Sequence, residues 1–71
     1  MGKPKGLKNR LFVAAVLKMS FRLREDEQSA AFKGSYPGVL RDLELEDEAV
    51  EAYIEENRAA VEAAARGKPP V

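Results

Sequence analysis

The chain has 71 residues, and its 12 basic and 12 acidic side chains give a formal net charge of zero. We expect a single small domain, residues 1–71, because a chain of this length buries only about 60 % of its unfolded surface. It contains no cysteine and no histidine, which excludes disulfides and removes the commonest general base and the thiol nucleophile. We therefore predict a cytoplasmic protein that is no enzyme, holds no cofactor and no metal, and gains stability from oligomerisation or from a partner.

The charges are divided along the chain. Residues 25–57 hold eleven acidic side chains against Lys33 and Arg41, whereas residues 1–24 hold basic side chains and no acid. Such asymmetry indicates contact with nucleic acid or a membrane. Two other interpretations remain open: the basic stretch pairs with the acidic helix of its own or a neighbouring subunit, or both stretches are solvated faces. The candidate residues for binding nucleic acid or an acidic partner are Lys5, Lys8, Arg10, Lys18, Arg22 and Arg24.

The N-terminal third is predicted to be a flexible arm followed by a helix. Residues 1–6 contain a proline, two glycines and two lysines, which is typical of a flexible basic arm. Residues 7–24 form a basic amphipathic segment in which Phe12, Val16 and Met19 recur at helical spacing. Residues 17–24 also alternate between apolar and polar, as a strand does. We favour a helix of about five turns, because no turn residue interrupts the segment, and keep the strand at 17–24 as the alternative.

The middle of the chain is predicted to contain a short helix and a loop. Residues 26–33 can form a short helix through an Ala-Ala-Phe run. Residues 34–38 follow with two glycines around a proline, and the residue before a proline is biased away from helical geometry. We therefore predict a loop at 34–38.

A long helix is predicted over residues 43–66. Asp42 can act as its N-cap, and Gly67 is placed to end it before the tail 67–71. Such a helix is about 36 Å long at 1.5 Å per residue, too long for one short partner helix to cover. A second subunit is therefore expected on its apolar stripe, where the polar Asn57 would either set the register or lie in water at a break in the stripe. The predicted interface residues are Val50, Tyr53, Ile54, Asn57, Val61 and Ala64.

The predicted fold is thus mostly α: a long C-terminal helix plus an N-terminal helix, in a small helical domain that is oligomeric.

Acidic side chains cluster near the start of the C-terminal helix, where a cation could bind. The cluster lacks the glycine-centred loop and ligand spacing of an EF-hand, and a helix start that favours negative charge accounts for it. Its members are Asp42, Glu44, Glu46, Asp47, Glu48 and Glu51.

Two stretches resemble short bacterial antitoxins. The sequence Leu-Lys-Met-Ser-Phe-Arg-Leu-Arg at 17–24 looks like the basic strand that opens a ribbon-helix-helix antitoxin. Residues 48–58 are similar to the closing helix of many short antitoxins, the helix-turn-helix type included. The resemblance implies a dimeric DNA-binding repressor that also masks a toxin. The chain departs from the ribbon-helix-helix pattern at 34–38, where that family needs a continuous helix.

These observations lead to three functional hypotheses. The first is a small non-enzymatic regulator, antitoxin-like or otherwise, that binds a macromolecule, most plausibly nucleic acid, through its basic N-terminal segment. The alternative is a structural subunit or inhibitor that docks on a larger protein assembly through complementary charged surfaces. The third, ranked last, is a peripheral membrane protein that uses residues 7–24.

Overall fold

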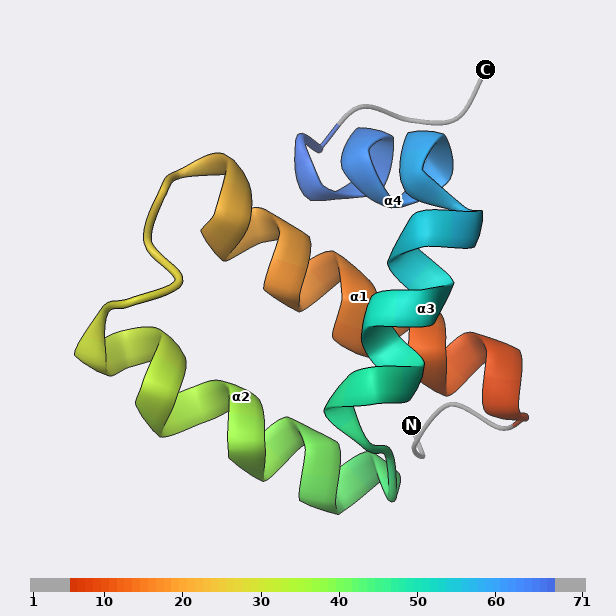
Figure 1. Cartoon of the computed structure of the whole chain (residues 1–71), viewed down its shortest axis with the longest axis horizontal. Coiled ribbons are helices and arrows are strands. Elements are labelled where there is room, and N and C mark those ends of the chain that lie inside the picture. Colours follow the sequence, from red (N-terminus) through yellow and green to blue (C-terminus); the bar gives the residue numbers. More distant parts are fainter. Residues whose placement is uncertain (1–5, 68–71) are drawn as a thin grey trace.

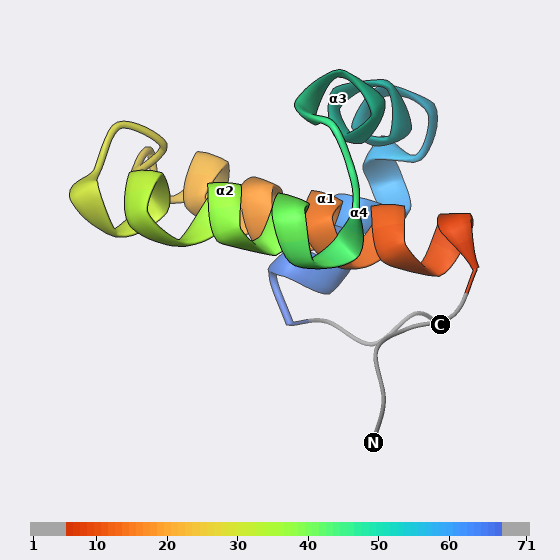
Figure 2. The same ribbon diagram turned by 90° about the horizontal axis from the view of Figure 1, so that it is seen from below.

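The computed structural model describes residues 6–67, which form four helices and contain no strand. The helices are α1 (Leu7–Leu23), α2 (Ala30–Leu43), α3 (Asp47–Glu56) and α4 (Arg58–Ala65). α1 packs against each of the other three, and α2 runs back in roughly the opposite direction (Figure 1). Figure 2 shows that α1 and α2 share a layer and that α3 crosses one face of it. The mostly helical fold is therefore confirmed.

Helix α1 confirms the predicted N-terminal helix, and the alternative strand at 17–24 is wrong. Its buried positions follow helical spacing, with Ala14 and Ala15 one turn before Lys18 and Met19. The small alanine pair lets a neighbouring helix approach closely. Leu23, which completes the predicted helical stripe through Met19 and also fits the strand pattern, is 37 % exposed at the end of the helix. The alternation of apolar and polar residues at 17–24 therefore does not indicate a strand.

The predicted loop at 34–38 is also wrong, because α2 runs through it without interruption. The helix begins at Ser29, whose Oγ accepts a hydrogen bond from the Phe32 backbone N–H at 3.1 Å, and not at residue 26. Pro37 lies inside the helix and costs it one backbone hydrogen bond. Tyr36 offsets this cost, since it is buried and its ring stacks on Phe32 with centroids 4.8 Å apart. The burial of Tyr36 and its contact with Phe32, one turn earlier in the same helix, therefore outweigh three local helix breakers.

The single long helix predicted over 43–66 is instead the end of α2 followed by two shorter helices. Leu43 is the last residue of α2, and the N-cap of α3 is Glu46 rather than Asp42. A second break at Asn57 separates α3 from α4. The predicted stop at Gly67 is confirmed, because this glycine has a φ of +75° directly after the C-cap Arg66. The remaining predictions for residues 1–5 and 68–71 lie outside the described residues.

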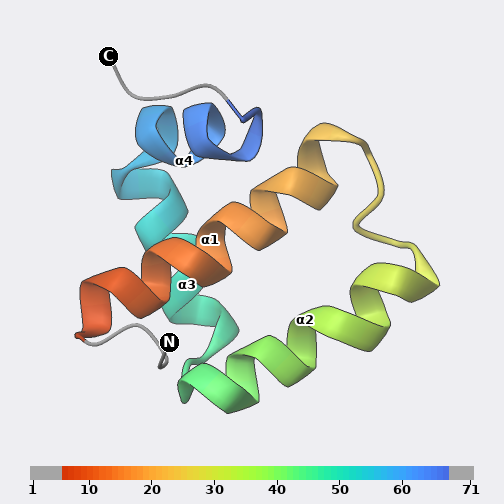
Figure 3. The same ribbon diagram turned by 180° about the vertical axis from the view of Figure 1, so that it is seen from behind.

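The core lies where α1 meets the other three helices. Figure 3 shows α1 in front of α3 when the molecule is viewed from behind, so that α3 covers one side of α1. The break at Asn57 lets α4 fold back on α1 as well. The described residues therefore contain no long helix that would require a second subunit to cover it, and oligomerisation remains a prediction. The buried apolar residues of the central cluster are Ala14, Ala15, Met19, Tyr36, Leu43, Val50, Ile54 and Val61.

Candidate functional site

A cluster of charged side chains joins α1 to α3. Lys18 projects from the buried face of α1, and its side chain is only 8 % exposed. Its ammonium lies 2.7 Å from Oδ1 of Asp47 and also pairs with Glu51, one turn later on α3. The spacing of the two carboxylates on α3 places both beside the same cation. The buried lysine is therefore neutralised within the chain.

Two more side chains extend this cluster to α2 and to the loop before it. Arg22, one turn after Lys18, donates from Nη2 to Glu51 at 2.8 Å and from Nε to Glu27 at 2.9 Å. The Tyr36 hydroxyl donates to Oδ1 of Asp47 at 2.7 Å. The Lys18 ammonium also lies 5.2 Å from the centre of the Tyr36 ring. The cluster thus holds three helices and one loop together.

The pKa values of these groups are displaced away from neutrality. Burial opposes the charge on Lys18, but hydrogen bonds to Asp47 and Glu51 outweigh it and raise its pKa. The hydrogen bond from Lys18, and then that from Tyr36, lowers the pKa of Asp47. Burial would raise the pKa of Glu51, yet Lys18 and Arg22 lower it overall. Burial, assisted by Asp47, raises the pKa of Tyr36. A general acid or base needs the opposite displacement, so the cluster is suited to holding the fold together rather than to proton transfer.

The structure does not bring the six predicted basic residues together into one surface. Lys18 and Arg22 face α3, and Arg10 donates from Nη1 to the Leu43 carbonyl at 2.9 Å. Lys8 and Arg24 are exposed, but 16 residues of helix separate them by about 24 Å. The guanidinium of Arg24 lies over the Phe21 ring, 4.8 Å from its centre. Lys5, the sixth residue, is outside the described residues.

The residues predicted for a subunit interface are divided between the core and the partly exposed surface of this chain. Val50, Ile54 and Val61 are almost fully buried in the chain's own core, because α3 and α4 both pack on α1. They are therefore unavailable to a second subunit in this conformation. Tyr53 and Asn57 are half-buried, and Ala64 is half-buried on α4. Tyr53 forms an edge contact with Phe12, with ring centroids 6.5 Å apart.

An open groove, which sequence reasoning missed, lies between the start of α1 and the end of α3. Its volume is about 480 Å³, and one of its walls carries Leu7, which is 57 % exposed. The groove combines segments that are more than forty residues apart, so neither segment alone predicts it. The one-turn spacing of Leu7 and Leu11, before the continuous apolar run, was the available signal. The lining residues are Leu7, Lys8, Leu11, Tyr53, Glu56 and Asn57.

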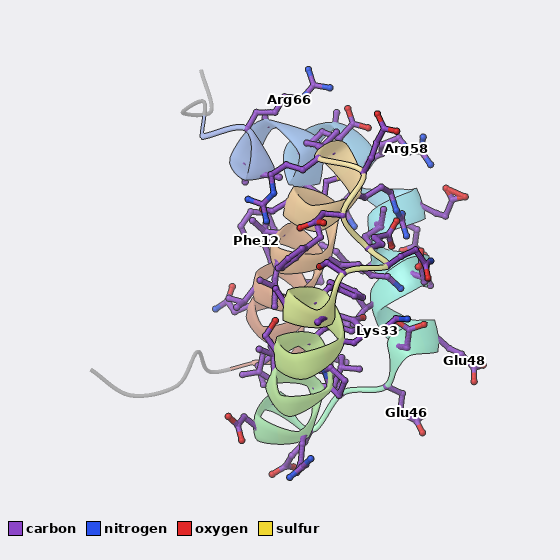
Figure 4. All side chains as sticks on the ribbon, turned by 90° about the vertical axis from the view of Figure 1, so that its left-hand side faces the viewer. Phe12, Lys33, Glu46, Glu48, Arg58 and Arg66 are labelled. Carbon is purple, nitrogen blue, oxygen red and sulfur yellow. The ribbon has the colours of Figure 1, made fainter. Side chains whose placement is uncertain are left out.

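The outer face of α3 beside this groove is acidic. Glu48, Glu55 and Glu56 are exposed, and no basic residue occurs between Arg41 and Arg58. Figure 4 shows Glu46 and Glu48 pointing away from the helices. Arg58 pairs with Glu55 at 3.3 Å. Within residues 6–67, no group of three acidic side chains has the arrangement needed to hold a metal ion.

Comparison with protein families, with curated proteins and with solved structures finds no match to this chain. None of the helices in residues 6–67 is both long and apolar enough to cross a membrane. The geometry of the charged cluster, the groove and the acidic face is therefore what a functional proposal has to rest on.

Proposed function

We propose that this chain is a small non-enzymatic module that docks on a larger protein through the acidic face of α3 and the adjoining groove. The observation that carries the proposal is the internal pairing of Lys18 and Arg22 with Asp47 and Glu51. The pairing removes two cations from the surface of α1. The carboxylates on the opposite side of α3, led by Glu48 and Glu56, are left facing solvent.

The groove and the acidic face together define the chemistry of the partner. An apolar side chain can sit between Leu7, Leu11 and Tyr53, and a basic side chain beside it can reach Glu56 at the rim. Apolar anchors provide most of the affinity at such surfaces, whereas complementary rim charges increase the association rate and select the partner. The best match is a helix or loop that carries leucine-like residues flanked by lysine or arginine.

Nucleic-acid binding and the antitoxin hypothesis remain predictions, and one observation weighs against them. Two of the six candidate phosphate-binding residues, Lys18 and Arg22, would first have to leave their carboxylates. Residues 17–24, which carried the resemblance to an opening strand, are helical up to Leu23. Membrane binding would likewise draw on α1, whose Ala14, Ala15 and Met19 face the core. These arrangements favour the protein-docking hypothesis.

The proposal is tested with a fluorescent amphipathic peptide of leucine and lysine as the probe. We expect binding, measured by anisotropy, to weaken about tenfold in the double variant Glu48→Gln/Glu56→Gln, because one carboxylate of the groove and one of the exposed face of α3 are lost. Since the chain contains no tryptophan and Tyr36 is buried, a change in tyrosine emission on binding would report on Tyr53 in the groove.

The matched control is Glu25→Gln/Glu62→Gln, which changes the net charge equally but lies outside α3. It should bind the peptide almost as the wild type does. Equal losses in the two double variants would mean that only net charge matters and would contradict a site on α3.

A further inference from the structure

The break between α3 and α4 has no local cause in the sequence. Asn57 alone separates the helices, with φ −128° and ψ 32°, and Figure 1 shows α4 turning away from α3. No glycine or proline occurs between residues 45 and 66. All seven residues of α4 after its first are alanine, valine or glutamate, and five of them are alanine, the best helix former. Sharp kinks are almost always caused by proline, glycine or an inserted group. The bend is therefore imposed by packing on α1.

The bend leaves backbone groups at the start of α4 without the partners that a straight helix would provide. In the described residues, the backbone bonds across the break are Asn57 N–H to the Tyr53 carbonyl at 2.9 Å and Val61 N–H to the Asn57 carbonyl at 3.0 Å. The Asn57 side chain does not cap α4, because its Nδ2 donates back to Tyr53 at 3.1 Å. A straight helix would let the N–H groups of residues 58–60 donate to residues 54–56.

α4 is attached to α1 through one apolar face. Val61 is the one α4 residue that is fully buried, and Ala65 packs at the edge of the core. Ala59 and Ala60 are exposed. An exchange keeps these same contacts, because the site that Val61 would vacate on α1 fits another α4 of identical sequence. A second copy can fill it while both chains gain the missing helical hydrogen bonds.

We propose that α4 is an exchangeable arm, which straightens at Asn57 and packs on the α1 of a second copy to form a reciprocal dimer. The partner is this same chain, because the vacated surface on α1 was shaped by its own α4. The dimer would contain a continuous helix from Asp47 to Ala65. This inference is independent of the docking site on the outer face of α3.

The test uses two variants that differ only in helix propensity at the hinge. Asn57→Ala and Asn57→Gly both remove the side chain and its bond to Tyr53. Alanine is favoured over glycine in a helix by about five-fold, and a dimer contains two hinges, so the dimerisation constants should differ by about 25-fold. Light scattering over a concentration series, after refolding at high concentration, measures this difference, and circular dichroism shows that both variants are folded.

A second readout separates exchange from contact between outer surfaces. One chain carries spin labels at both Glu48→Cys and Arg66→Cys and is diluted into unlabelled protein, so that only distances within a chain are measured. The two labels should lie about 27 Å apart along a continuous helix and closer together in the bent chain. The long distance in the dimer fraction, of wild type or Asn57→Ala, supports the proposal. It is overturned by equal masses for both hinge variants, or by a dimer that keeps the distance found in the monomer.

Discussion

At the scale of single residues, Lys18 is the buried cation at the centre of the charged cluster that joins α1 to α3. Replacing it in Lys18→Met keeps the length of the side chain but leaves Asp47 and Glu51 without their shared cation. We expect a loss of about 1–3 kcal/mol in the free energy of unfolding, below the value for a fully buried pair because both carboxylates are partly exposed. Urea unfolding measures this loss.

Lys8→Met is the matched control, since Lys8 is exposed on the same helix. A surface substitution of this kind should change the free energy of unfolding by less than about 0.5 kcal/mol. Equal stability of the two variants would show that the Lys18 cluster contributes nothing to the fold.

The same cluster predicts how stability depends on pH. Asp47 and Glu51 have pKa values below the ordinary 3.8 and 4.5, so their contribution is complete above those values and is lost as the pH falls through the lower folded-state pKa values. Lys18 and Tyr36 have pKa values above 10.5 and 10.0, so their contribution is lost as the pH rises beyond these ordinary values. Unfolding midpoints measured across pH should therefore decline at both ends.

Glu51→Gln isolates one of these contributions. The variant should show a shallower decline below pH 4.5 than the wild type, because it lacks one carboxylate whose pKa is lowered by folding. A decline of unchanged steepness would contradict the pairing of Glu51 with Lys18 and Arg22.

At the scale of elements, α2 is where local sequence and final structure disagree most. Gly34 and Gly38 lie inside the helix, and a Cβ at either position would meet no atom within 4 Å. Gly34→Ala and Gly38→Ala should each stabilise the fold by about 0.5–1 kcal/mol, because glycine is the more costly residue in a helix. Thermal unfolding measures this gain.

Gly67→Ala is the opposite case, because the φ of +75° at this position is unfavourable for any residue with a Cβ. It should destabilise the fold by about 1 kcal/mol. If the alanines at 34 and 38 also destabilised the chain, the segment would be the loop that its glycines and proline indicate, and α2 would end before it.

The elements that could be predicted are those whose signals are local. The uninterrupted periodicity of residues 7–23 and the glycine at 67 predicted α1 and the end of α4. The continuation of α2 through Pro37 depends on Tyr36 reaching Asp47 of α3, a contact between two elements that the local pattern at 34–38 does not contain. The break at Asn57 depends on Val61 packing on α1 and carries no turn signal at all.

The sequence contains a signal for the charged cluster, although Lys18 and Arg22 are among the residues predicted to bind a partner. Lys18 and Arg22 are one helical turn apart, as are Asp47 and Glu51, so two complementary pairs were present in the pattern. Pairing within the chain was one of the open interpretations, and the structure selects it for these four residues. The groove could not be predicted, because it needs the relative placement of α1 and α3.

At the scale of the whole molecule, the division of charge along the chain does not become a division between two charged faces. Part of the basic N-terminal stretch turns inward to meet α3, and the outer carboxylates of α3 remain exposed. A molecule with zero net charge thus presents a locally acidic surface next to an apolar groove. Such a surface suits a basic protein partner better than it suits a phosphate backbone.

Whether the basic side chains of α1 are free to bind a partner is tested most directly by the anisotropy of a fluorescent DNA duplex. The duplex is mixed with the wild-type chain at about 50 and about 200 mM salt. With Lys18 and Arg22 engaged inside the fold, we predict no saturable binding at either concentration, while the leucine–lysine peptide binds under the same conditions. Tight binding of the duplex at the lower salt concentration that weakens steeply at the higher one would contradict the account, because it would require the basic face that α1 has turned towards α3.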